Sequence, residues 1–132
     1  MFIRYNFAPR NGDKIQYIVI HNTANANVGA GALAHFNYFN GADRGASADF
    51  FIDDKNIIQV IDYRVNYSWA VGDGKGANGI TNRNSVSIEI CENPDMDYNK
   101  AVQNAVELAQ YLMKELGLGA ASLWRIQKNL SS

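Results

Sequence analysis

The chain has 132 residues, of which 47% are hydrophobic, 19% charged and 11% aromatic, with 12 basic against 13 acidic side chains. This composition indicates a single globular domain over residues 1–132 and excludes a disordered chain; one cysteine excludes a disulfide-stapled miniprotein. The net charge of −1 offers no basic field for nucleic acid, and no apolar stretch is long enough to span a membrane. The first residues lack the apolar core of a signal peptide, so we expect a protein made in the cytoplasm.

The first third of the chain alternates strand and helix patterns. Residues 15–20 are apolar and β-branched, which predicts a buried strand ending at His21. Apolar residues at near-helical spacing predict a helix over residues 30–40 that stops at Gly41. Two apolar runs around a polar turn then predict a hairpin over residues 49–61.

The second half repeats the alternation. Glycines predict a loop over residues 72–76, and its spacing does not match a phosphate-binding loop. Residues 84–91 alternate as a strand does. An apolar stripe predicts a helix over residues 98–116, with Asp97 as N-cap and Gly117 as its stop. The order of elements predicts an α/β fold in which helices flank a mixed central β-sheet.

His21 stands at the carboxyl end of the first predicted strand, which is where open α/β sheets place their ligand crevice. Imidazole is a common metal ligand and a general base near neutral pH. A histidine held by local hydrogen bonds at a strand end explains the position equally well. Position alone leaves both interpretations open.

Glu89 lies in the middle of the predicted strand over residues 84–91, where a carboxylate is disfavoured by strand propensity. Alternation places Val86, Ile88 and Ile90 on the core side and Glu89 on the opposite face. If that face lines a cleft, burial suits the carboxylate to acid–base chemistry. On the strand pattern alone we favour the simpler interpretation, a solvated face.

Other candidate residues carry weaker signals. Cys91 shares the face of Glu89 and could form a nucleophile pair with His21 or His35, although free cysteines are usually buried and inert. We expect His35 itself, within a predicted helix, to be structural or on the surface. Tyr67 and Trp69 either line a groove for sugar or peptide or belong to the core.

Four segments together resemble one known family. They occur in the family's order at residues 17–24 (YIVIHNTA), 45–54 (GASADFFIDD), 69–75 (WAVGDGK) and 85–91 (SVSIEIC). The chain resembles the type 2 N-acetylmuramoyl-L-alanine amidases, which share the fold of peptidoglycan recognition proteins, and among them the prophage endolysins. The match covers residues from about 17 to 118.

The resemblance implies a zinc-dependent peptidoglycan hydrolase that acts on the cell wall once released. Such enzymes cleave the amide between N-acetylmuramic acid and the L-alanine of the stem peptide. His21 matches the first zinc ligand and Glu89 the catalytic glutamate, while Asn22 and Thr23 are expected to contact substrate. A catalytic zinc needs three protein ligands and an open fourth position.

The tail departs from the family pattern. The family places its second histidine in a strand after the long helix and a third ligand shortly beyond it, whereas residues 119–132 contain neither histidine nor cysteine. Asp49 is a weak substitute ligand. We therefore expect a domain truncated at its C-terminus, without the last strand and helix, whose exposed edge favours a homodimer.

Apolar tail residues recur at roughly helical spacing and are expected to cover the gap or to pair with a second copy: Leu123, Trp124, Ile126 and Leu130. Peptidoglycan is the expected partner, and two functions toward it remain open. One is an active zinc amidase. The other is a catalytically impaired binding module, or a truncated prophage remnant, of the same fold.

Overall fold

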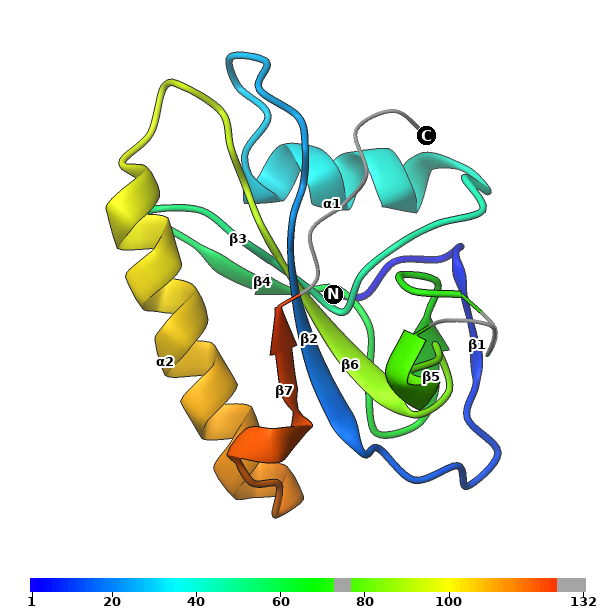
Figure 1. Ribbon diagram of the computed structural model, residues 1–132. Helices are drawn as coiled ribbons and strands as arrows, with labels where there is room; N and C mark the ends of the chain where they lie inside the picture. Colours follow the sequence, from blue (N-terminus) through cyan, green and yellow to red (C-terminus); the bar gives the residue numbers. More distant parts are fainter. Residues whose placement is uncertain (73–76, 126–132) are drawn as a thin grey trace.

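The computed structural model describes residues 1–72 and 77–125, and its centre is a five-stranded mixed sheet (Figure 1). In the order β4-β3-β6-β2-β7, the strands span Ile57–Gln59, Phe50–Ile52, Ser85–Ile90, Tyr17–Asn22 and Leu123–Arg125. β3, β6, β2 and β7 run parallel, and β4 closes a hairpin with β3. The predicted mixed α/β architecture is therefore confirmed.

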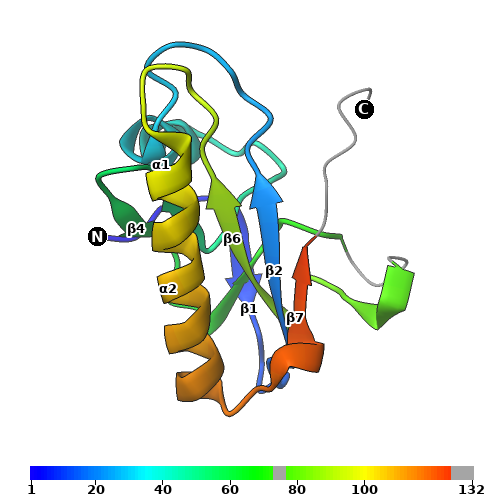
Figure 2. The same ribbon diagram turned by 60° about the vertical axis from the view of Figure 1, so that its left-hand side comes forward.

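Two helices lie on opposite faces of this sheet, α1 (Ala32–Gly41) and α2 (Tyr98–Leu116), as Figures 1 and 2 show together. A second small sheet pairs β1 (Phe7–Pro9) with β5 (Asn66–Ser68). Short 3-10 turns occupy Ala77–Gly79 and Ala120–Ser122. Within the described residues no helix is long and apolar enough to cross a bilayer.

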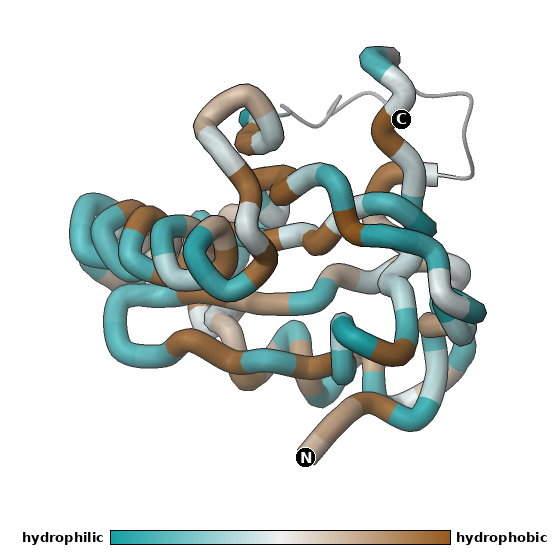
Figure 3. The backbone as a smooth tube through the Cα atoms, turned by 90° about the horizontal axis from the view of Figure 1, so that it is seen from below, coloured by the Kyte–Doolittle hydropathy of each residue, from teal (hydrophilic) through white to brown (hydrophobic). Residues whose placement is uncertain are grey.

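α2 begins and ends where the sequence predicts. The Asp97 side chain accepts a hydrogen bond from the Lys100 backbone, and Gly117 takes the left-handed conformation (φ 67°) that ends many helices. Figure 3 shows hydrophobic and hydrophilic residues alternating along its turns, at the left of the view. The apolar stripe of α2 faces the sheet, so the helix packs along its length against the strands.

The larger core lies between α2 and the sheet. Strand residues Ile18, Val86 and Ile88 meet Ala105 and Leu112 of the helix, all of them buried. Each large apolar side chain buried in this way contributes about 1.5–3 kcal/mol to stability. This layer packs against the central strands on the face of the sheet opposite α1.

The core on the α1 side is smaller and more polar. Phe51 of β3 packs with Ala32 and Phe36 of α1, and Cys91 joins this cluster. The same face carries the buried side chains Ser87 and Glu89 of β6. β6 is therefore buried on both faces, and its alternation separates an apolar layer from a polar one rather than core from solvent.

The tail contains a strand, so the expectation that the last strand is missing is wrong. Leu123 and Trp124 belong to β7, which pairs parallel with β2, and not to a helix. The last strand is thus present, and the edge of β2 is covered. The expected homodimer is not supported, because the edge of β2 on which it rested is covered by β7. Ile126 and Leu130 lie outside the described residues.

Candidate active site

The side chains of His21 and Glu89 meet at the carboxyl ends of two neighbouring parallel strands. His21 pairs in register with Glu89, and Phe51 flanks Glu89 on the other side. The Nδ1 atom of His21 lies 3.7 Å from Oε1 of Glu89, and both side chains are 3% exposed. The solvated face favoured by the strand pattern is therefore wrong. Glu89 lines a cavity, whereas His21 lies beside it at the carboxyl end of β2 and is not one of the lining residues.

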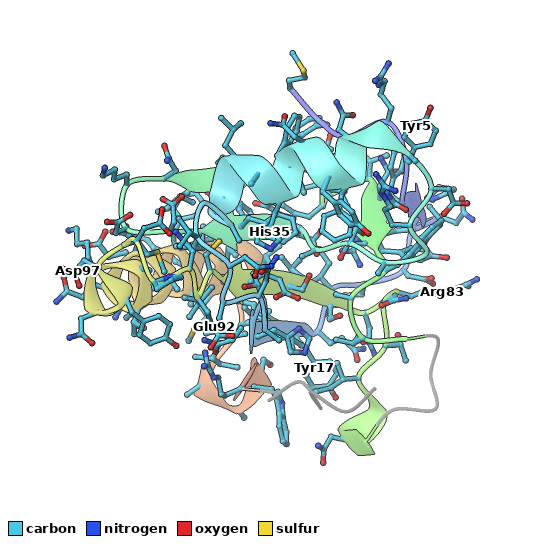
Figure 4. The ribbon with its side chains drawn as sticks, turned by 90° about the horizontal axis from the view of Figure 1, so that it is seen from above. Tyr5, Tyr17, His35, Arg83, Glu92 and Asp97 are labelled. Atoms are coloured by element: carbon cyan, nitrogen blue, oxygen red, sulfur yellow. The ribbon has the colours of Figure 1, made fainter. Side chains whose placement is uncertain are left out.

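His35 also faces this site. It lies on the buried face of α1 with Ala32 and Phe36, and it extends from the helix toward the sheet (Figure 4). Its ring stacks on Phe51 at 5.1 Å between centroids, and its Nδ1 donates a hydrogen bond to the Gly31 carbonyl at 2.8 Å. The expectation of a structural residue accounts for these contacts, but not for its place in the cavity wall.

A cavity of about 540 Å³ opens between α1 and the sheet. Its polar wall includes Glu89, His35 and Thr23, and its aromatic wall includes Tyr38 and Trp69. The remaining lining residues are Asn25, Ala30, Ala34, Phe39, Ala46, Ser47, Phe51 and Ala70. One carboxylate in a cavity of mostly alanine and aromatic side chains suits a ligand that offers apolar surface and a few polar atoms.

Two residues expected to contact substrate lie elsewhere. The Asn22 amide donates to the Tyr98 hydroxyl at 2.6 Å, and its oxygen accepts from the Arg125 guanidinium, so this side chain ties α2 and β7 to β2. Tyr67 lies on β5 beneath the guanidinium of Arg83, outside the cavity wall. Of the four candidates, Thr23 and Trp69 line the cavity.

Asp49, the weak candidate ligand, is fully buried one row behind Glu89 on the same face. Its Oδ2 accepts hydrogen bonds from the Ser87 amide at 2.9 Å and from the Ser68 hydroxyl at 2.8 Å. Burial raises the pKa of this carboxyl above its ordinary value of 3.8, although these hydrogen bonds and the charge of Arg10 oppose the rise. Asp49 thus joins β3 to β6 and β5.

Cys91 is poorly placed to act as a nucleophile. Its sulfur lies 3.9 Å from the His35 Nδ1, a nitrogen that already donates its hydrogen to Gly31. Burial, with the charges of Asp53 and Glu89, raises the pKa of the Cys91 thiol to about 12. A thiol that keeps its proton at neutral pH is a poor nucleophile.

The donors needed for a complete metal centre are not assembled. Over residues 1–72 and 77–125, no three His, Cys, Asp or Glu side chains lie close enough to hold one ion. Outside these ranges the chain offers Asp73 alone among such residues, because residues 126–132 contain none. Within the described residues, His21 and Glu89 are therefore two adjacent donors that belong to no group of three.

Comparison with known proteins shows which family the chain resembles in sequence. The family model described as N-acetylmuramoyl-L-alanine amidase matches residues 11–126, a range that runs through β7. The amidase XlyA of Bacillus subtilis (strain 168) is 45% identical over 107 residues, covering 81% of this chain and 35% of XlyA. The amidase CwlH of the same organism is 44% identical over 99 residues, covering 75% of this chain and 38% of CwlH.

Solved structures agree with the sequence matches. The catalytic domain of XlyA superposes with a TM-score of 0.76 at 37% identity and covers 95% of this chain and 84% of that domain. A mutant endolysin from Bacillus subtilis gives a TM-score of 0.77 at 39% identity, with coverage of 95% and 84%. The chain thus spans little more than a third of XlyA and CwlH but most of one catalytic domain.

Proposed function

Because the chain belongs to the N-acetylmuramoyl-L-alanine amidase family, we propose that it binds peptidoglycan and hydrolyses the amide between N-acetylmuramic acid and L-alanine. The observation that carries this proposal is the buried Glu89 carboxylate, 3.7 Å from His21, in the wall of a 540 Å³ cavity. A carboxylate in that position can accept a proton from water that enters the cavity.

The proposed reaction has two proton transfers. Glu89 accepts a proton as the water oxygen attacks the carbonyl carbon of the lactyl amide. The carbon–nitrogen bond then breaks, and Glu89 returns the proton to the departing nitrogen of L-alanine. His21 lies beside the carboxylate and orients it, while Trp69 and Tyr38 provide flat surfaces that position the substrate.

The zinc dependence that the resemblance implies does not fit the donors of the described residues. A catalytic zinc takes three protein ligands, polarises the carbonyl and lowers the pKa of its bound water. Here His21 has Glu89 beside it and no third donor within the described part of the chain.

This incomplete donor set supports a second candidate function, a peptidoglycan-binding module. The cavity and its aromatic wall would bind the same muropeptide without cleaving it. Glu89 would then contribute to recognition alone.

One experiment separates the two functions. The protein, with and without added zinc, is incubated with purified cell-wall sacculi, and new N-terminal alanine is quantified alongside co-sedimentation of the protein. An amidase releases alanine termini, and Glu89→Gln lowers this release at least about a hundredfold while co-sedimentation persists. Glu107→Gln, an exposed glutamate on α2, is the matched control. Co-sedimentation without any release of alanine termini supports the binding module. If the protein neither releases alanine termini nor co-sediments with the sacculi, both functions are refuted.

The zinc question has its own measurement. Zinc content per chain is determined for the wild type and for His21→Ala after loading and dialysis. The donor set predicts that the wild type retains far less than one zinc per chain. Stoichiometric zinc that His21→Ala removes would show that further donors, Asp73 or a second chain, complete the site.

A further inference from the structure

Asn6 lies outside the cavity wall, yet it bonds to the elements that form both sides of it. We propose that Asn6 is a positioning residue that sets the separation between the end of α1, which carries Tyr38 and Phe39, and the segment that carries Trp69. The side chain is 3% exposed, so its polar groups must be satisfied inside the protein.

The first side of the cavity is held through the Asn6 side chain. Its Nδ2 donates hydrogen bonds to the Phe39 carbonyl at 2.8 Å and to the Ala42 carbonyl at 3.0 Å. Carbonyl groups at the end of a helix lack intrahelical partners, so this amide supplies a partner that α1 needs. The position of the last turn of α1 is thereby tied to Asn6.

A second path reaches the same side through Arg44. The Arg44 amide donates to Oδ1 of Asn6 at 2.7 Å. The Arg44 guanidinium lies over the Tyr38 ring at 4.1 Å, and its Nε donates to the Tyr38 carbonyl at 3.2 Å. Asn6 therefore fixes a residue that holds an exposed aromatic ring of the cavity wall in place.

The opposite side is held through the Asn6 backbone. The Ser47 hydroxyl donates to the Asn6 carbonyl at 2.5 Å and accepts a hydrogen bond from the Trp69 amide at 3.0 Å. The Ser47 amide in turn donates to the Trp69 carbonyl at 3.1 Å. Ser47 is buried and lines the cavity, so the path from Asn6 to Trp69 has one intermediate residue.

The backbone of Asn6 accounts for the choice of residue. Its φ of 70° lies in the left-handed region, which asparagine and glycine tolerate and most side chains do not. Asparagine alone combines that conformation with an amide that donates and accepts. Asn6→Gly keeps the backbone path and removes the side-chain clamp.

The test observes Trp69 directly. The protein is labelled with 5-fluorotryptophan in a Trp124→Phe background, which leaves one fluorine resonance, that of Trp69. We expect Asn6→Gly to shift or broaden this resonance, because it releases the end of α1, whose Tyr38 and Phe39 line the same cavity as Trp69. The matched control is Asn11→Gly, an exposed asparagine with a φ of 54°, which should leave the resonance unchanged.

Ligand affinity is the second readout, and its interpretation depends on the proposed function. The probe is muramyl dipeptide, which contains the lactyl–alanine amide. Loss of the two donated hydrogen bonds should weaken its binding about tenfold in Asn6→Gly and not in Asn11→Gly. If the wild type does not bind the probe, the proposed ligand is wrong, and the fluorine resonance still decides the role of Asn6.

Ser47→Ala supplies an independent variant should Asn6→Gly not fold. It removes the hydroxyl between Asn6 and Trp69 while leaving the clamp on α1 intact, so the Trp69 resonance should again move. A lowered melting temperature with an unchanged resonance and affinity in Asn6→Gly would show a merely structural role. An unchanged resonance in Ser47→Ala would overturn the proposed path.

Discussion

The Nδ1 of His21 lies 3.7 Å from the Oε1 of Glu89, with both side chains almost fully removed from solvent on adjacent parallel strands. Two polar groups placed so close inside a protein interact more strongly than they would in water. We expect His21→Asn and Glu89→Gln to be non-additive, with a coupling energy of about 0.5–3 kcal/mol. Urea unfolding of both single variants and the double variant measures it. Additive effects would contradict a direct interaction between the two side chains.

Asp49 makes the stability of the fold depend on pH. Because burial raises its folded-state pKa above 3.8, the unfolded chain releases its proton first as pH rises. The contribution of Asp49 to the free energy of unfolding is fully present below its unfolded-state pKa. It decreases as pH rises through its folded-state pKa, by at most about 1.4 kcal/mol per pH unit. Asp49→Asn removes this loss, so its stability relative to the wild type should increase with pH above about 4.

Urea unfolding of the wild type and Asp49→Asn at several pH values between 4 and 8 measures this difference. Asp43→Asn, at an exposed position, is the control. Its free energy of unfolding relative to the wild type should not increase with pH in the same way. A relative stability of Asp49→Asn that stays constant or falls with pH would mean that Asp49 is ionised in the native protein.

Gly31 has no room for a side chain. A Cβ atom at this position would lie 2.9 Å from Oδ2 of Asp53, the oxygen that accepts a hydrogen bond from the Ala32 amide at the start of α1. Gly31→Ala should therefore displace Asp53 and lower the free energy of unfolding by about 1–3 kcal/mol. Thermal and urea unfolding measure this loss. Gly119→Ala, with nothing within 4 Å of the added Cβ, should change stability by less than about 0.5 kcal/mol.

The Cys91 thiol should be inert in the folded protein. With a pKa raised to about 12 and a buried sulfur, it is expected to resist alkylation by iodoacetamide at pH 8 and to react once urea unfolds the chain. Mass spectrometry of both samples measures the difference. Cys91→Ala should also leave any hydrolysis unchanged. Rapid labelling of the native protein, or loss of hydrolysis in the variant, would restore cysteine chemistry as a candidate.

Long periodic patterns made much of the fold predictable. The bounds of α2 follow from nineteen residues of helical spacing between a capping aspartate and a stop glycine. The strands that carry His21 and Glu89 were also predicted. β3 and β4, each three residues long, were predictable because two apolar runs flank a short polar turn. β1, β5 and β7 are equally short but pair with strands distant in the sequence, so no local pattern predicts them. That is also why the apolar residues of β7 were misinterpreted as helical.

The site was predictable in its chemistry and less so in its surroundings. The motif around His21 and Glu89 indicated the pair, but strand alternation does not tell a solvated face from a polar layer under a second helix. The sequence does carry a signal for His35: His35 and Phe36 follow Ala32 by three and four residues, so the three share one helical face. That face had to point toward the sheet, and therefore toward Glu89.

The pairing of β2 with β7 has a consequence for synthesis on the ribosome. β2 is complete by residue 22, and all residues of the cavity wall have been made by residue 89, yet the neighbour of β2 on its outer side comes from Leu123–Arg125. From the completion of β6 at Ile90 until Leu123–Arg125 is made, β2 has one unpaired edge, the kind of edge that invites association between chains. The nascent domain is therefore exposed to association after the residues of its cavity wall have been made and before β7 covers the edge of β2.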